Sequence, residues 1–84
     1  MPYITQDARR YIDAGGVPRT PGELNYAITR EVDRYIFTHG LTYAHINDAL
    51  GAIEGAKLEA YRRLAAPYED GKIATNGDVY RTQS

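Results

Sequence analysis

Basic and aromatic side chains gather between residues 57 and 68, and together they could hold an anionic, planar ligand. Lys57 and Tyr61 are four residues apart, so in a helix they share a face, where a cation can neutralise a phosphate beside a stacking ring. The set that we assign to such a nucleotide site is Lys57, Tyr61, Arg62, Arg63 and Tyr68. The alternative is a solvated helix end, because both arginines would meet the helix dipole and pair with nearby carboxylates.

A second polar group lies nearer the N-terminus, at Asn25, Tyr26 and Arg30. Tyr26 and Arg30 are four residues apart and share a helical face, whereas Asn25 need not. Asn25 or Asn47 could read the polar edge of a base, while an arginine binds phosphate. We therefore add Asn25, Tyr26, Arg30 and Asn47 to the candidate ligand-binding residues.

Residues for catalysis or metal binding are few in this sequence. There is no cysteine, Ser84 is terminal, and neither histidine lies near a plausible nucleophile in the sequence. His39 and His45 flank a predicted turn and lack a second pair of ligands at metal spacing, which favours a turn or capping role. We expect no enzyme activity, no metal site and no cofactor.

Small residues are unusually dense in one predicted helix, at Ala49, Gly51, Ala52, Gly55 and Ala56. Each glycine inside a helix costs about 1 kcal/mol relative to alanine, so two of them need an offsetting reason unless they are simply tolerated. Close approach of another helix would supply that reason, and so would a ligand. We expect these five residues to form an interface between copies of the chain in a homo-oligomer.

These residues fall on four helices that the sequence predicts at about 5–14, 21–39, 43–66 and 67–75. Thr20-Pro21-Gly22-Glu23 has the form of a capping box and is the clearest helix start. Gly40 separates the second and third helices by a short link, which predicts an antiparallel hairpin. Pro67 forbids simple continuation of the third helix. Asn76-Gly77 could cap the fourth helix or form a hairpin turn, and we favour the helix.

Length and composition set the remaining limits. The chain has 84 residues, so we expect one domain, residues 1–84, of the all-α class. Its core must be thin, and without cysteine it must be stabilised by helix packing or by self-association. Ten basic and eleven acidic residues give a net charge of −1, which argues against general nucleic-acid binding. Residues 1–7 contain neither a basic region nor an apolar run, and no stretch approaches about 20 apolar residues, so we expect no membrane association and a cytoplasmic location.

Read as a whole, the sequence resembles an uncharacterised family of short proteins encoded by tailed bacteriophages and prophages. The resemblance rests on motifs along nearly the full chain: Met1-Pro2-Tyr3-Ile4, Gly22-Glu23-Leu24-Asn25-Tyr26-Ala27-Ile28-Thr29, Ile46-Asn47-Asp48-Ala49-Leu50-Gly51-Ala52-Ile53-Glu54, Lys57-Leu58-Glu59-Ala60-Tyr61-Arg62-Arg63, Ala66-Pro67-Tyr68-Glu69-Asp70 and Asn76-Gly77-Asp78-Val79-Tyr80. Gly55 and Gly71 depart from the family pattern. The resemblance implies a phage accessory protein in the cytoplasm of an infected bacterium.

Size, helical class and phage context suggest a function by analogy alone. Some small helical phage proteins are oligomers that sequester nucleotide second messengers of bacterial immunity, such as cyclic dinucleotides or ADP-ribose derivatives. We therefore expect a homo-oligomer that binds such a signal without turnover. The alternative is a protein-binding inhibitor or adaptor with no small-molecule ligand, and a structural phage component is a third possibility.

Overall fold

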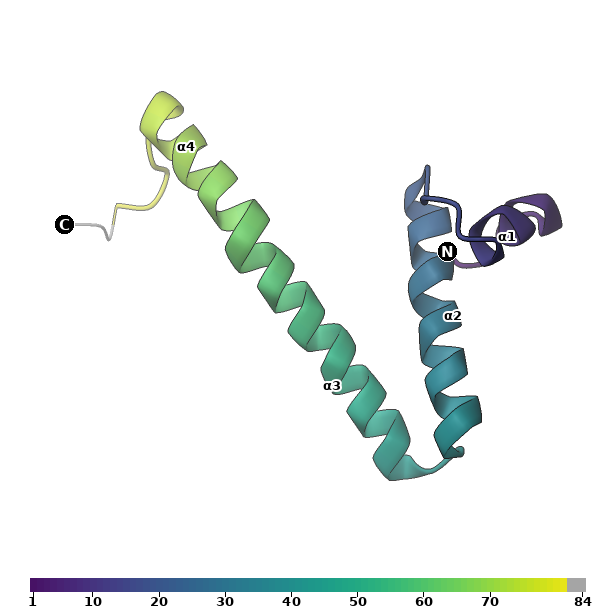
Figure 1. The fold of residues 1–84 in the computed structure, drawn as a ribbon. Helices are drawn as coiled ribbons and strands as arrows, with labels where there is room; N and C mark the ends of the chain where they lie inside the picture. The colour runs from purple at the N-terminus through teal and green to yellow at the C-terminus, as the bar shows by residue number, and fades with distance from the viewer. Residues whose placement is uncertain (82–84) are drawn as a thin grey trace. The chain divides into compact units, whose positions relative to one another are not determined.

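The computed structural model describes residues 1–81, and within this range the chain forms helices and no strand (Figure 1). The elements in chain order are α1 (Gln6–Asp13), α2 (Pro21–His39), α3 (Tyr43–Ala60), the π-helical turn η1 (Tyr61–Ala65) and α4 (Ala66–Asn76). The predicted all-α class is therefore confirmed. The chain divides into two units, Met1–Ala49 and Leu50–Ser84. The antiparallel hairpin and the homo-oligomer stay predictions.

Threonine side chains begin the helices of the first unit. Thr5 accepts a hydrogen bond from the Ala8 N–H at 3.2 Å, and Thr42 accepts one from the His45 N–H at 3.1 Å. Thr20 does the same for the Glu23 N–H at 3.1 Å, so the first half of the predicted capping box is present. The Glu23 carboxylate, however, accepts from the Arg19 N–H at 2.9 Å, one residue before the expected donor.

Two glycines end α1 and turn the chain towards α2. Gly15 has φ of 96°, and its N–H and that of Gly16 donate to carbonyl oxygens of α1 in the Schellman pattern. An ideal Cβ at Gly16 would lie 2.4 Å from Cζ of Tyr11, so only glycine allows the Tyr11 ring to sit over this turn. The Tyr11 hydroxyl donates to the Val17 carbonyl at 2.8 Å, which holds the loop against α1.

The helix α1 packs against α2 on the face that carries Glu23 and Tyr26, both of which are only 6% exposed. The apolar row of α2, which consists of Leu24, Ile28, Val32 and Tyr35, lies on a different face. Its members Leu24, Ile28 and Tyr35 are 53%, 46% and 38% exposed. Within the first unit, α1 and α2 are therefore held together through a largely polar interface, and α1 does not cover the apolar row of α2.

The turn between α2 and α3 is built from glycine and aromatic rings. Gly40 has φ of 106°, and its carbonyl accepts from the Thr42 N–H at 3.1 Å. Nδ1 of His45 lies 2.8 Å from the same carbonyl. The ring centroids of Tyr35 and His39 are 4.5 Å apart, and those of His39 and His45 are 5.9 Å apart. The histidines thus help to form this turn.

The expected helix break at Pro67 does not occur. The backbone stays helical at Ala60, Ala65 and Ala66, so the chain is helical from Tyr43 to Asn76 without interruption. The N–H of Ala66 bonds to the carbonyl of Tyr61, five residues back, in the turn η1. Proline has no N–H and its ring crowds the preceding turn. The wider π-helical turn accommodates Pro67, which replaces the predicted junction between separate helices at 43–66 and 67–75.

The C-terminal end of α4 shows whether Asn76-Gly77 caps a helix or forms a hairpin turn. The chain is helical through Asn76, and the Gly77 N–H donates to the Ile73 carbonyl at 2.8 Å. Gly77 has φ of 91°, which suits glycine and stops the helix. Asn76-Gly77 therefore terminates a helix instead of forming a hairpin turn.

Candidate functional site

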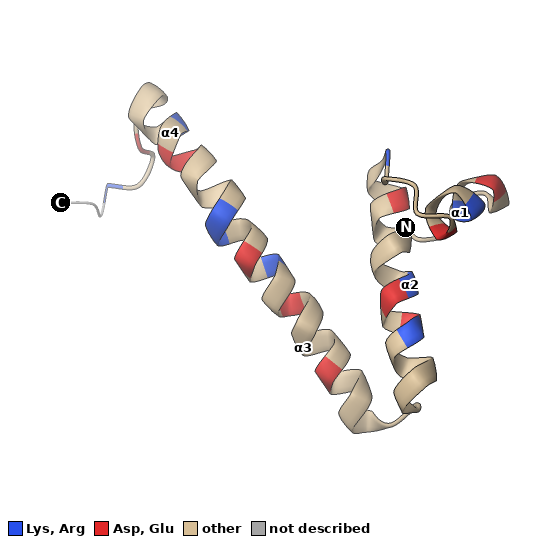
Figure 2. Ribbon diagram, in the orientation of Figure 1, with Lys and Arg blue, Asp and Glu red and all other residues tan. Residues whose placement is uncertain are grey.

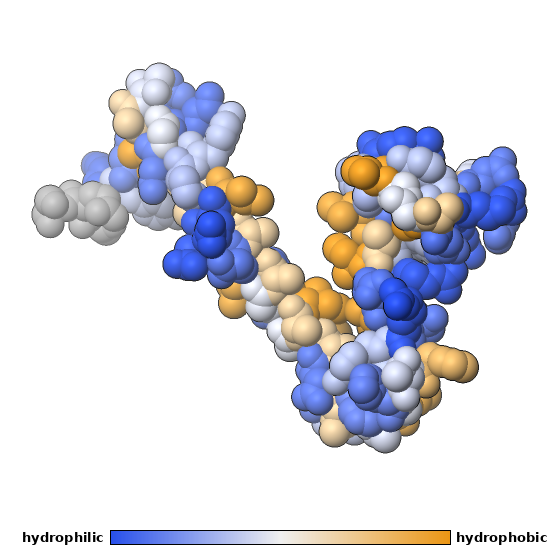
Figure 3. Space-filling model, viewed as in Figure 1, coloured by the Kyte–Doolittle hydropathy of each residue, from blue (hydrophilic) through white to orange (hydrophobic). Residues whose placement is uncertain are grey.

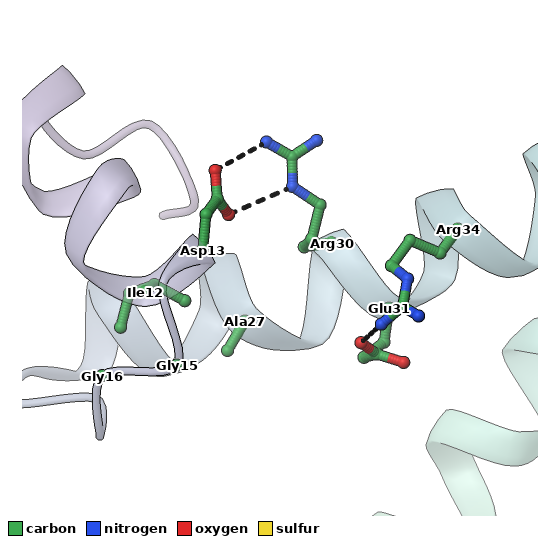
Figure 4. A pocket seen from close by; sticks show the side chains of 8 residues that line it. All are labelled: Ile12, Asp13, Gly15, Gly16, Ala27, Arg30, Glu31 and Arg34. Atoms are coloured by element: carbon green, nitrogen blue, oxygen red, sulfur yellow. Dashed lines mark hydrogen bonds and ion pairs between the residues drawn. The ribbon is translucent and has the colours of Figure 1, made fainter.

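One polar cluster of the first unit joins α1 to α2 at Asp13, Tyr26 and Arg30. The Tyr26 hydroxyl donates to the two carboxylate oxygens of Asp13 at 3.0 and 3.1 Å, and it accepts from Nη2 of Arg30 at 2.5 Å. Arg30 also donates to Asp13 at 3.3 and 3.4 Å (Figure 4). The hydrogen bonds from Arg30, and then the one from Tyr26, lower the pKa of the Asp13 carboxyl. Asp13 is therefore a fixed anion, which ties the two helices together.

A second cluster lies at the start of α2, around the buried carboxylate of Glu23. Arg19 donates to it from Nε at 3.0 Å and from Nη2 at 2.9 Å, in addition to its backbone N–H. These hydrogen bonds from the Arg19 side chain and backbone lower the pKa of Glu23. The Arg19 guanidinium also lies 3.9 Å from the centroid of the Tyr11 ring. Glu23 thus anchors the loop and α1 to α2.

Between these helices the first unit has an open pocket of about 530 Å³ (Figure 4). Its lining residues are Ile12, Asp13, Gly15, Gly16, Ala27, Arg30, Glu31 and Arg34. Both arginines are occupied, since Arg34 pairs with Glu31 at 2.6 Å and Arg30 pairs with Asp13. The four charged groups cancel in formal charge. The pocket therefore offers no excess positive charge for a phosphate.

Of the candidate residues on α2, only Tyr26 and Arg30 are brought together, and both bind Asp13 of α1. Tyr26 is 6% exposed, so its ring is covered and has no open face for a base. Asn25 is exposed and accepts from the Thr29 hydroxyl at 3.2 Å. Asn47 is exposed on α3. Their predicted roles in ligand binding stay untested.

The candidates of the second unit are all exposed. Arg62 and Arg63 both pair with Glu59, at 3.3 and 3.5 Å, which is the solvated arrangement that the sequence offered as an alternative. Tyr61 and Tyr68 are 57% and 68% exposed. Nζ of Lys72, which the sequence did not single out, lies 5.6 Å from the centroid of the Tyr68 ring. Figure 2 shows charges of both signs along α3 and α4.

The small residues of the predicted interface span an arc of roughly 160° on α3, with Gly51 and Gly55 at one edge of the arc and Ala49 at the other. Gly51 and Gly55 each lie two residues from Ile53, which is about 200° around an α-helix, so they point away from it. Apart from the adjacent residues and the backbone of the helix itself, no atom lies within 4 Å of an ideal Cβ at either glycine. Ala49 is buried, while Ala52 and Ala56 are exposed. Their role in an interface stays a prediction.

Two residues at the centre of the polar clusters escaped sequence analysis. Asp13 is 13 and 17 residues from its partners, and no local spacing indicates such a contact. Arg19 directly precedes the capping Thr20, so a basic residue before a capping box was a usable signal. Among residues 1–81, no group of three His, Cys, Asp or Glu side chains is placed to hold a metal ion. Within the same range, no helix has the length and hydropathy needed to cross a membrane.

Comparison with known proteins places the chain in a family. It matches no curated protein, and no solved structure matches it. The family model described as "Domain of unknown function (DUF6899)" matches residues 1–79. This match covers nearly the whole chain, in line with the resemblance to an uncharacterised family, and the chain belongs to the DUF6899 family.

Proposed function

We propose that this protein is a bacteriophage accessory protein that acts by binding another protein, as an inhibitor or adaptor, and not by chemical turnover. The observation that carries the proposal is the open apolar row of α2, formed by Leu24, Ile28, Val32 and Tyr35. Three of its four side chains are between 38% and 53% exposed, and Val32 is half-buried. Figure 3 shows apolar surface along this helix. Contiguous exposed apolar surface on a small protein is typical of an interaction site.

The shape of this surface suits a helix better than a small molecule. From Leu24 to Tyr35 the row runs for about 16 Å along one side of α2, at a rise of about 1.5 Å per residue. An amphipathic helix of a partner can lay its own apolar side chains along such a row. Small ligands instead favour concave pockets that bury most of their surface. We therefore expect the target to present an amphipathic helix.

The polar residues give a second argument for protein binding over nucleotide sequestration. Tyr26 is covered and Arg30 is bound to Asp13, so both support the fold of the first unit. Arg62 and Arg63 share Glu59. A nucleotide would have to displace these carboxylates, which weakens the case for a pocket made of tyrosine and arginine. The resemblance to phage proteins supports a place of action in the cytoplasm of an infected bacterium.

A photo-cross-linking amino acid at Ile28 tests the proposal in living bacteria. We expect one adduct of discrete mass, in an amount comparable to the protein itself, that contains a different protein. The matched control places the same amino acid at Thr29, which is the next residue and lies off the apolar row. Leu24→Asp should abolish the adduct at position 28 without unfolding α2, which circular dichroism would check. Equal adducts at both positions, or an adduct only with another copy of this chain, would contradict the proposal.

A second candidate function is sequestration of a nucleotide-derived signal, and one observation favours it. The rings of Tyr61 and Tyr68 are largely exposed, and Nζ of Lys72 lies 5.6 Å from the centroid of the Tyr68 ring, so an exposed ring and a cation lie side by side in the second unit. Stacking on such rings is tolerant of base identity. Calorimetry with cyclic dinucleotides and ADP-ribose derivatives would detect it. If nucleotide binding releases heat in the wild type but not in Tyr68→Leu, and if no adduct forms at position 28, sequestration and not protein binding is the function.

A further inference from the structure

The helix α3 carries a row of side chains at alternating spacings of four and three residues. The row consists of Ile46, Leu50, Ile53, Lys57 and Ala60, and we call it the α3 seam. Its large apolar members Ile46, Leu50 and Ile53 are 37%, 59% and 38% exposed. This alternation is the pattern by which two helices pack along their length, knobs into holes. The α3 seam therefore needs a second helix to cover it.

The charge of Lys57 limits which helix can cover the α3 seam. Lys57 lies within the seam, and among the described residues it forms no ion pair, whereas most arginines do. A lysine in a helix seam is costly unless a carboxylate meets it, and such residues set register and orientation. The chain offers Glu54 at the edge of the same seam, three residues earlier. The occupant of the seam must bring a carboxylate level with Lys57.

The α2 helix of the same chain does not supply that carboxylate. In an antiparallel return through the turn, Lys57 would lie level with Asn25, since both are sixteen residues from Leu41. At this level α2 presents the apolar side chains of Leu24 and Ile28. Glu23 lies nearby in sequence, but its carboxylate is buried and bound by Arg19.

We propose that a second copy of this chain covers the α3 seam, with the two α3 helices antiparallel about a two-fold axis between Ile53 and Lys57. In this register Lys57 of each copy meets Glu54 of the other, so the same attractive contact occurs twice. Leu50 lies opposite Ala60, which matches a large side chain to a small one. Parallel helices would instead place Lys57 against Lys57. The inference is independent of the proposed target-binding row, because that row belongs to α2.

Sedimentation equilibrium and native mass spectrometry of the full chain test the pairing. We expect a wild-type dimer. Lys57→Glu and Glu54→Lys should each weaken the homodimer at least tenfold, because each variant brings like charges together twice. An equimolar mixture of the two variants should form a one-to-one heterodimer with an affinity near that of the wild type, because opposite charges then face each other across the seam. Within each variant chain, residues 54 and 57 carry like charges in the mixture as well, so recovery of the dimer affinity can come only from contacts between chains. Recovery also shows that both variants fold.

The control is Arg62→Glu, which makes the same change of charge as Lys57→Glu but lies in η1, outside the seam. It should leave the dimer unchanged. Wild-type protein that remains monomeric at about 1 mM would overturn the proposal, since even a weak dimer is populated there. The antiparallel register would be overturned if Glu54→Lys alone paired normally, or if Lys57→Glu paired as well with wild type as with Glu54→Lys.

Discussion

Replacing Gly51 and Gly55 by alanine should stabilise the protein, because both glycines lie in the interior of α3 with open space around them. Apart from the adjacent residues and the backbone of α3 itself, no atom lies within 4 Å of an ideal Cβ at either position, so an added methyl group meets no other part of the chain. Alanine is favoured over glycine by about 1 kcal/mol in the interior of a helix. The double variant should therefore unfold with a free energy higher by about 2 kcal/mol. For a chain of this size that raises the melting temperature by roughly 8–16 °C.

Denaturant unfolding followed by circular dichroism at several protein concentrations measures this change. Gly71→Ala is a matched control, because Gly71 is also helical with open space around it and lies on α4. It should add about 1 kcal/mol. Gly40→Ala should do the opposite, since its φ of 106° strains any residue with a side chain.

The result also separates the two faces of α3. If the interface between copies used Gly51 and Gly55, the added methyl groups would push a neighbouring helix away, and both stability and oligomer mass would fall. Pairing through the α3 seam predicts that the dimer survives, because both glycines point away from Ile53. A loss of stability in the double variant, with Gly71→Ala still stabilising, would refute this reasoning.

Three further predictions concern the first unit. Folding lowers the pKa values of Asp13 and Glu23 below their ordinary 3.8 and 4.5, so the unfolded chain binds more protons at acid pH. The free energy of unfolding, measured as a function of pH, should therefore be constant above these values and fall below them. Glu23→Gln should make this fall at acid pH less steep. Gly16→Ala should lower the melting temperature in calorimetry, because its Cβ would lie 2.4 Å from Tyr11. Tyr26→Phe should cost about 1 kcal/mol in denaturant unfolding, because Asp13 loses a hydrogen bond; an unchanged value would show that the hydroxyl contributes nothing.

Features that depend on neighbouring residues can be predicted from this sequence. Thr20 and Pro21 mark the start of α2, and the all-α class follows from such caps and from apolar spacing, because both signals lie within a few residues of the structure they specify. The continuous helix across Pro67 was missed, since the rule that proline ends a helix assumes spacing of four residues and not the wider π-helical turn.

The candidate site was harder to predict because its contacts are long-range. Tyr26 and Arg30 were chosen as ligand-binding residues on spacing alone. Their actual partner Asp13 lies on another helix and becomes visible only once α1 is packed against α2. Spacing on one helix shows which side chains share a face, but it does not show what covers that face. The residues of a polar helix interface and those of a ligand site therefore look alike in sequence.

The polar clusters of the first unit have a consequence for binding through α2. Most of the stability of a helix in a protein comes from packing against other elements and not from intrinsic propensity. Here Asp13 and Arg19 clamp one side of it to α1 and the preceding loop, and Thr20 caps its first turn. The apolar row on the other side is thus presented by a helix that is already formed. A partner then pays less conformational entropy on binding than it would with a disordered segment, so weakening the clamp by Asp13→Asn should reduce affinity for a target without touching the binding row.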